Sequence, residues 1–419
     1  MDLGTPIRER LEELVALAQT YRGWSLRRLA GELHRDPQSV IPESGVPKID
    51  LVRGLAMALD WSIEDVVRDL YGETPRPIEP GSEHESFVTL DRAAYEAFQK
   101  GSYVEMVDLA RRAYTAAETG DERARACIRE YGAWDGQGRF TQAMETAQRG
   151  LRESGVTASN ELSLRVNLAN SHYVLGNFYE GEALASAVIE LSNAPMLPLN
   201  ALGTRGFAFY VRGNCHRAMA GAKPEQRDHY AQRAIEDLAS SSRILMAESA
   251  RLNAESLAGI ANICEGGILE MKVITGEIPV EVAIERFVGS LDRVLDPQRQ
   301  ALGMWLESFG WWCIFGGNVS LRHVVDDARA EQLIAVFTNK ADEIADRLGN
   351  WMLREQVWTL EMARRNRAVA GGIEVIAAGD RDWLLDLEDA KKVAGTMARF
   401  PVFRETGWQV LRSSRIVKG

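Results

Sequence analysis

Three polar side chains recur at helical spacing in the segment "LRVNLANSHYVLGNFY". Asn167, Asn170 and Tyr173 follow one another at steps of three, so they lie near one side of a helix. Asparagine carries both a hydrogen-bond donor and an acceptor, and a row of asparagines can therefore hold an extended peptide backbone. Further residues could extend this row: Arg205, Tyr210, Asn214, Asn253 and Asn262. Ordinary exposure, or hydrogen bonding between neighbouring helices, is the alternative interpretation.

Residues that could support catalysis or bind a metal show no recognisable pattern. The chain has no G-x-x-x-x-G-K-[ST], G-x-S-x-G or H-E-x-x-H motif. No metal-ligand spacing links the six histidines, which are His34, His84, His172, His216, His229 and His323. No C-x-x-C pair occurs among the cysteines, Cys127, Cys215, Cys264 and Cys313, which we interpret as buried small side chains. We expect neither an enzyme nor a cofactor.

Aromatic residues form another group of candidates. Ten tryptophans are present, and five gather towards the C-terminus: Trp305, Trp311, Trp312, Trp351 and Trp358. Large side chains that fill gaps between long helices are the first interpretation. An aromatic ligand pocket is the alternative.

Length, composition and charge limit the function classes. The 419 residues predict two to three domains, and a hydrophobic content of 46% is ample for real cores. The net charge of -11 repels polyanions, which argues against nonspecific coating of DNA or RNA. No apolar run is long enough to span a membrane, and the N-terminus carries charges where a signal peptide has its apolar core. We therefore expect a cytoplasmic protein without membrane contact.

A change in composition divides the chain. Residues 72–86, GETPRPIEPGSEHES, hold three prolines and two glycines among polar residues, which predicts a linker. Residues 1–71 show short amphipathic helical patterns, and residues 87–419 form a long helical region without a convincing strand. The predicted fold class is all-α.

The long region contains a repeat. Four glycines, Gly101, Gly138, Gly176 and Gly213, are spaced by 37, 38 and 37 residues. Two residues after them stand Tyr103, Phe140, Phe178 and Cys215, and nine after them stand Ala110, Ala147, Ala185 and Ala222. We expect each glycine to close a turn between two helices, the aromatic ring to fill the space between them and the small residues to allow close approach.

This pattern resembles the tetratricopeptide repeat, in which antiparallel helix pairs stack into a solenoid. The period exceeds the family's usual length of about 34 residues, which predicts longer helices. The pattern is clear to about residue 225 and diverges beyond it, with possible units around Gly276 and Gly317 and two long helices over 329–368. An irregular helical bundle is the alternative.

The N-terminal region predicts two short helices joined by a tight turn. Ser25 is a suitable N-cap for the first helix, and Asp36-Pro37 suits the start of the second. Pro42 limits this second helix to about six residues, from Asp36 to Ile41.

The region resembles the lambda-repressor/Cro-like (Xre-type) helix-turn-helix family. The matching elements, in order, are Leu29-Ala30, Val40, Glu43-Ser44-Gly45 with Pro47, and Leu55-Ala56-Met57-Ala58-Leu59 with Ser62. The resemblance implies that Gln38 and Ser39 face DNA bases. It also implies contacts with phosphates or groove edges from Arg27, Arg28, Arg35 and Lys48.

The charge of this region leaves two interpretations open. Residues 1–73 hold 9 basic against 13 acidic residues, whereas specific DNA-binding domains usually show a basic footprint. Sequence-specific DNA binding is one interpretation, and a degenerate helix-turn-helix that contacts protein is the other. Acidic side chains such as Glu32, Asp36 and Glu43 would favour the second if they interrupted the basic surface.

The combined architecture resembles the bacterial transcription regulators that respond to signalling peptides. This resemblance implies a homodimer whose solenoid binds a peptide or small ligand, as in quorum sensing, and thereby controls the binding of double-stranded DNA. The alternative is a non-enzymatic adaptor whose solenoid binds a protein partner.

Overall fold

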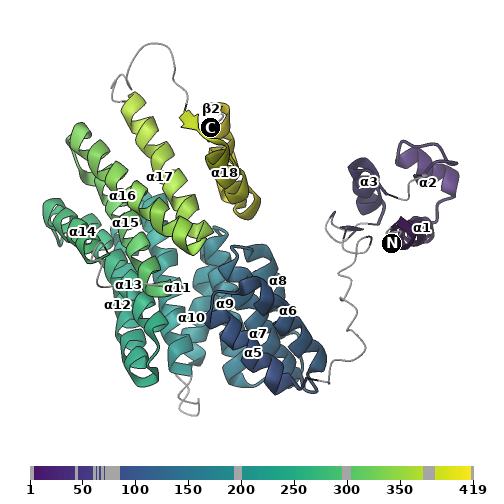
Figure 1. Cartoon of the computed structure of the whole chain (residues 1–419), viewed down its shortest axis with the longest axis horizontal. Coiled ribbons are helices and arrows are strands. Elements are labelled where there is room, and N and C mark those ends of the chain that lie inside the picture. Colours follow the sequence, from purple (N-terminus) through teal and green to yellow (C-terminus); the bar gives the residue numbers. More distant parts are fainter. Residues whose placement is uncertain are drawn as a thin grey trace. The chain divides into compact units, whose positions relative to one another are not determined.

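The computed structural model describes residues 4–42, 46–59, 63, 66–67, 70, 85–192, 201–294, 303–370 and 383–416. The fold class is all-α, as predicted. The chain divides into two compact units, Met1–His84, called the N-terminal unit below, and Glu85–Gly419, called the repeat unit (Figure 1). Most of the predicted linker, residues 72–84, lies outside the described residues.

Three helices of the N-terminal unit pack around a small core: α1 (Gly4–Arg22), α2 (Leu26–Glu32) and α3 (Ile49–Leu59). Ser25 caps α2 as predicted, because its hydroxyl accepts a hydrogen bond from the Arg28 amide. At the other end of the unit, the guanidinium of Arg22 donates to the carbonyls of Met57 and Ala58 and so satisfies the last turn of α3.

The prediction of a second helix in this motif, over residues 36–41, is wrong. Residues 36–41 form a turn, in which the Ser39 amide donates to the Asp36 carbonyl at 3.0 Å. The Asp36 carboxylate also accepts from the Gln38 amide at 2.8 Å, as an N-cap residue would, but no helix continues from this turn. Six residues before a proline give too few hydrogen bonds to offset helix nucleation. Val40 is nevertheless buried, as expected. The predicted Glu43-Ser44-Gly45 turn and Ser62 lie outside the described residues.

The repeat unit begins with three antiparallel helix pairs (Figure 1). They are α5 (Phe87–Gln99) with α6 (Tyr103–Ala116), α7 (Gly120–Gly136) with α8 (Phe140–Leu151), and α9 (Ala158–Val174) with α10 (Phe178–Leu191). Gly101, Gly138 and Gly176 precede the second helices with φ of +71°, +67° and +85°. Only glycine adopts this conformation without strain, which confirms the predicted turns.

Longer helices follow: α11 (Ala201–Ala222), the short 3₁₀ turn η1 (Pro224–Gln226), α12 (Arg227–Leu252), α13 (Glu255–Ile274), α14 (Val280–Val294), α15 (Gly303–His323), α16 (Asp327–Leu348) and α17 (Trp351–Ala370). The predicted pair of long helices over 329–368 is confirmed by α16 and α17. The predicted turn at Gly213 is wrong, because this glycine lies inside α11. A Cβ atom there would come within 2.8 Å of Leu238 on α12, so Gly213 serves close helix packing instead.

The C-terminal segment contains a short element that the sequence did not predict. Strand β1 (Trp383–Leu385) pairs in parallel with β2 (Ser414–Ile416), and between them lie α18 (Leu387–Arg399), the 3₁₀ turn η2 (Pro401–Phe403) and α19 (Arg404–Arg412). Phe400 packs on Phe140 of α8, with ring centroids 5.4 Å apart. The Arg399 guanidinium donates to the Gln137 carbonyl at 3.2 Å. The end of the repeat unit therefore packs back on its second helix pair.

Within the described part of the chain, none of the helices combines the length and apolar character needed to cross a membrane.

Candidate functional site

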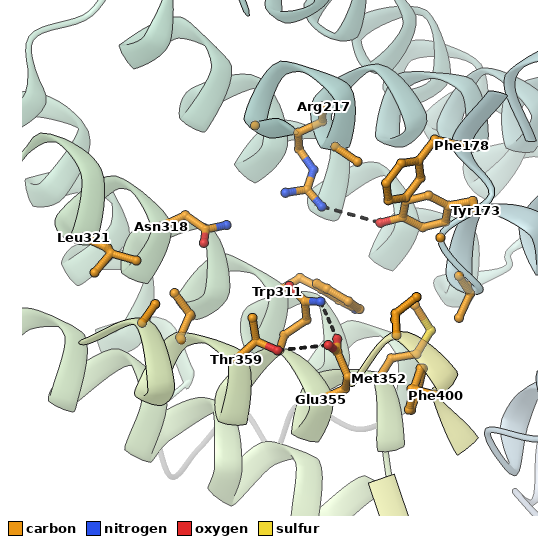
Figure 2. A pocket seen from close by; sticks show the side chains of 18 of the residues that line it. Tyr173, Phe178, Arg217, Trp311, Asn318, Leu321, Met352, Glu355, Thr359 and Phe400 are labelled. Atoms are coloured by element: carbon orange, nitrogen blue, oxygen red, sulfur yellow. Dashed lines mark hydrogen bonds between the residues drawn. The ribbon is translucent and has the colours of Figure 1, made fainter. Parts of the chain in front are cut away.

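A cavity of about 370 Å³ lies inside the repeat unit, between segments that are distant in sequence (Figure 2). Its walls come from α9, α10, α11, α15, α17 and the segment around η2. Aromatic rings line it: Tyr173, Phe178, Trp311 and Phe400. Polar side chains line it as well: Arg217, Asn318, Glu355, Gln356 and Thr359.

One wall carries an arginine that several contacts hold in place. Arg217 on α11 donates to the carboxylate of Glu270 at 3.0 Å and to the side-chain oxygen of Asn214 at 3.1 Å. It also reaches the hydroxyl of Tyr173 at 3.5 Å, and burial raises the pKa of this phenol. The guanidinium further lies 4.8 Å from the ring centroid of Phe315. These contacts fix Arg217 and Tyr173 at the cavity wall.

The opposite wall carries a carboxylate. Figure 2 shows Glu355 on α17 across the cavity from Arg217. The carboxylate accepts hydrogen bonds from the hydroxyl of Thr359 at 2.9 Å and from the side-chain amide of Gln356. Burial raises the pKa of Glu355, and the only groups that act against this shift are its two neutral donors. No described lysine or arginine pairs with Glu355.

Two further carboxylates face the interior of the repeat unit. Asp135 on α7 accepts a hydrogen bond from the side-chain amide of Asn170 at 3.2 Å. Glu307 on α15 accepts from the indole N–H of Trp311 at 3.1 Å. Burial, followed by the negative charge of Glu307, raises the pKa of Asp135 to about 7.

The structure brings part of the predicted polar row to the cavity. Tyr173 lines it, and Asn214 stands behind the wall, where it orients Arg217. Asn170 and Asn262 form hydrogen bonds between neighbouring helices, which agrees with the alternative interpretation of the row. For Asn170 the partners are Asp135 and the hydroxyl of Tyr131.

The remaining members of the row do not line the cavity. Tyr210 stacks on Phe207, and Arg205 lies over the ring of Phe209. Asn167 is half-buried on α9, and Asn253 ends α12 in a left-handed conformation at φ of +50°. The row is therefore not one continuous ladder of exposed amides.

Sequence reasoning missed the charged residues of the cavity, of which Arg217 and Glu355 lie on opposite walls. Arg217 follows Asn214 by three residues, and Glu355 lies within "WMLREQVWTLEM", where both neighbouring turns of the helix carry large apolar residues. A charged residue on such an apolar face is the available signal. Trp311 lies at the cavity, so the aromatic-pocket alternative holds for this tryptophan.

In the N-terminal unit, the predicted DNA contacts fall on an interrupted basic surface. Arg27, Arg28 and Lys48 are exposed, and so are Gln38 and Ser39 in the turn that replaces the expected helix. Arg35 instead pairs with Asp50 at 2.9 Å, and only 17% of its side chain is exposed.

Acidic residues share this surface. Glu32 and Asp36 are both exposed next to the basic positions, whereas Glu43 lies outside the described residues. Arg28 also lies over the ring of Trp24, 5.1 Å from its centroid. The positive charge available for a phosphate backbone therefore comes from separate side chains rather than from one continuous patch.

Comparisons with known proteins give little further information. No family model matches the chain, and no curated protein matches it. Among solved structures, the crystal structure of Bacillus thuringiensis PlcR in complex with the peptide PapR7 and DNA aligns with a TM-score of 0.35 and 13% sequence identity. The alignment covers 83% of this chain and 99% of that chain. At this TM-score, neither the fold nor the site is inferred from that structure.

Proposed function

We propose that the chain is a ligand-responsive regulator in which the cavity of the repeat unit binds a peptide or small ligand. The observation that carries this proposal is the cavity itself. Its volume of about 370 Å³ falls in the range of ligand pockets, and aromatic walls surround a few convergent polar groups. Arg217 and Tyr173 are held in place by hydrogen bonds, so the site is preorganised.

The position of the cavity explains how a ligand could act at a distance. Its walls combine α9 and α11 with α15, α17 and the C-terminal segment. A ligand that touches all of these elements favours the arrangement in which they are closest, and so shifts the population of the repeat unit. The helices α5 to α8 follow directly on the segment that leads from the N-terminal unit. A shift of these helices would change the positions that the N-terminal unit can adopt.

For the output we propose binding of double-stranded DNA by the N-terminal unit in a homodimer. Support comes from the family's sequence elements, which occur in the expected order, and from the burial of Leu29, Ala30 and Val40, which the motif requires. Exposed Arg27, Arg28 and Lys48 supply the phosphate contacts. Two copies would place their reading surfaces about one turn of DNA apart.

An adaptor is the second candidate, and one observation favours it. The turn at residues 36–41 offers no helix for the major groove, and Glu32 and Asp36 interrupt the basic surface. In this case the N-terminal unit contacts another protein, and the cavity ligand controls that contact.

The two candidates are separated by recovering genomic DNA fragments bound to the full chain at a stated salt concentration. A regulator enriches a defined set of sites, and the double substitution Arg27→Ala/Arg28→Ala lowers their recovery. Arg233→Ala/Arg243→Ala, which replaces two exposed arginines on α12, is the control with the same loss of charge. Recovery without enriched sites, equal for all three proteins, would establish the adaptor instead.

A further inference from the structure

We propose that the cavity recognises a positively charged group, an ammonium or a guanidinium, which binds to Glu355 within the aromatic walls. This inference rests on the proposed ligand site and adds the chemical class of its ligand. Glu355 lines the cavity, and among the described residues its hydrogen-bond donors are the neutral side chains of Gln356 and Thr359.

The charges on the two cavity walls are unequal. Arg217 and Arg322 both line the cavity and share one carboxylate, that of Glu270, at 3.0 and 3.6 Å, so this wall keeps a net positive charge. In the described part of the chain, no cation pairs with Glu355. A buried carboxylate without a cation is costly unless it takes up a proton or gains a positively charged partner.

Two interior carboxylates add negative charge inside the repeat unit. Asp135 and Glu307 have hydrogen bonds from Asn170 and Trp311, which are neutral. Within the residues that the structure describes, neither carboxylate forms an ion pair. Glu307 is also connected to the cavity, since its partner Trp311 lies in the cavity wall.

The aromatic rings fit the same ligand class. Tyr173, Phe178, Trp311 and Phe400 line the cavity together with Glu355 (Figure 2). A cation over such ring faces is attracted by their quadrupoles, and more strongly when water is excluded. An anionic group could bind at Arg217 and Arg322 on one wall but would be repelled by Glu355 on the other. Asn318 and Gln356 can bind the neutral amide groups of such a ligand.

The cationic group can come from a peptide, through its amino terminus or a basic side chain, or from a free polyamine. Isothermal titration of the full chain distinguishes these sources with defined probes. The probes are the capped peptide Ala-Lys-Ala-Lys-Ala, its counterparts with glutamate or glutamine in place of lysine, and spermidine. Binding of the lysine peptide with displacement by spermidine indicates a polyamine site. Binding of the peptide without displacement indicates a peptide site.

The matched variants are Glu355→Gln and Glu343→Gln. Both remove one negative charge, but Glu343 is exposed on α16 and pairs with Lys340 away from the cavity. We expect Glu355→Gln to weaken binding of the cationic probe about tenfold or more and Glu343→Gln to leave it unchanged. Circular dichroism of the free proteins checks that both variants are folded.

Three results would overturn the inference: equal binding by the wild type and Glu355→Gln, preference for the glutamate peptide, or no binding of either cationic probe at millimolar concentration. The proposed regulator is tested separately by its DNA sites. Enriched sites combined with preference for a neutral or acidic ligand would remove the inference and leave the regulator intact. Cation binding without enriched DNA sites would leave the inference intact and remove the proposed regulator.

Discussion

The guanidinium of Arg35 and the carboxylate of Asp50 lie 2.9 Å apart, and this pair ties the turn after α2 to the first turn of α3. The arginine is mostly covered, with 17% of its side chain exposed, whereas the aspartate is 66% exposed. The pair thus occupies the guanidinium of Arg35, to which the family resemblance assigns a contact with DNA. It also holds the turn in place where the expected helix is missing.

Asp50→Asn is predicted to strengthen DNA binding, because it releases the Arg35 guanidinium for a phosphate. The slope of log Kd against log salt concentration should steepen by about one unit. Fluorescence anisotropy with a labelled duplex measures both quantities. Asp228→Asn on α12, which is also exposed, controls for the change in net charge. A larger effect of Asp228→Asn than of Asp50→Asn would contradict the assignment.

Two glycines of α11 are predicted to respond oppositely to alanine. At Gly213 a Cβ atom would lie 2.8 Å from Leu238, so Gly213→Ala should lower the free energy of unfolding by about 1–3 kcal/mol. At Gly203 no atom lies within 4 Å, so Gly203→Ala should stabilise the helix by about 0.5–1 kcal/mol. Urea unfolding followed by circular dichroism compares them. The same sign for both substitutions would refute the packing role of Gly213.

Arg367 is predicted to stabilise the junction between α15 and α16. Its guanidinium donates to the carbonyls of Leu321 and Val324 at 2.6 and 2.7 Å and to the carboxylate of Asp327 at 2.7 Å. Arg367→Ala leaves these acceptors without a partner and should cost about 2–4 kcal/mol of unfolding free energy. The midpoint of thermal unfolding of Arg367→Ala is compared with that of Arg233→Ala, which removes an exposed arginine. A midpoint shift no larger than that of Arg233→Ala would show that water replaces the lost donors.

Local signals in the sequence predicted the elements well. Ser25 begins a helix and Gly101, Gly138 and Gly176 close turns, because a cap or a positive φ depends on a few adjacent residues. At Gly213 the same residue type led to a wrong prediction of a turn, because this glycine lies inside α11. A glycine that allows close helix packing and one that forms a turn look alike until the neighbouring helix is known.

The site was harder to predict because its walls are far apart in the chain. Arg217 and Glu355 are on α11 and α17, and each is an ordinary polar residue within its own segment. The stacking of α11, α13, α15 and α17 on one another places these two helices at the same cavity. Tyr173 was predicted because its neighbours on α9 share its spacing, but its partner Arg217 could not be inferred from that helix.

Asp135 is predicted to make stability depend on pH. Its pKa is about 7 in the folded protein against 3.8 for an unperturbed carboxyl, so the folded state holds the proton more tightly. Its contribution therefore favours folding below about pH 4, declines as the pH rises towards 7, and remains a constant cost above that. Asp135→Asn should raise the free energy of unfolding at pH 8 by on the order of 2 kcal/mol relative to the wild type, and far less at pH 5.

Asp121 on α7 provides the opposite control. Although desolvation acts against ionisation, hydrogen bonds from the Thr157 amide and the Asn160 side chain lower the pKa of this carboxyl. Its ionised form therefore stabilises the folded state at neutral pH, and this contribution is lost as the pH falls through the folded pKa. Asp121→Asn should lower the free energy of unfolding more at pH 8 than near pH 3. Urea unfolding across this range measures both variants. A pH-independent effect of Asp135→Asn would mean that Asp135 is ionised at an ordinary pKa despite Glu307.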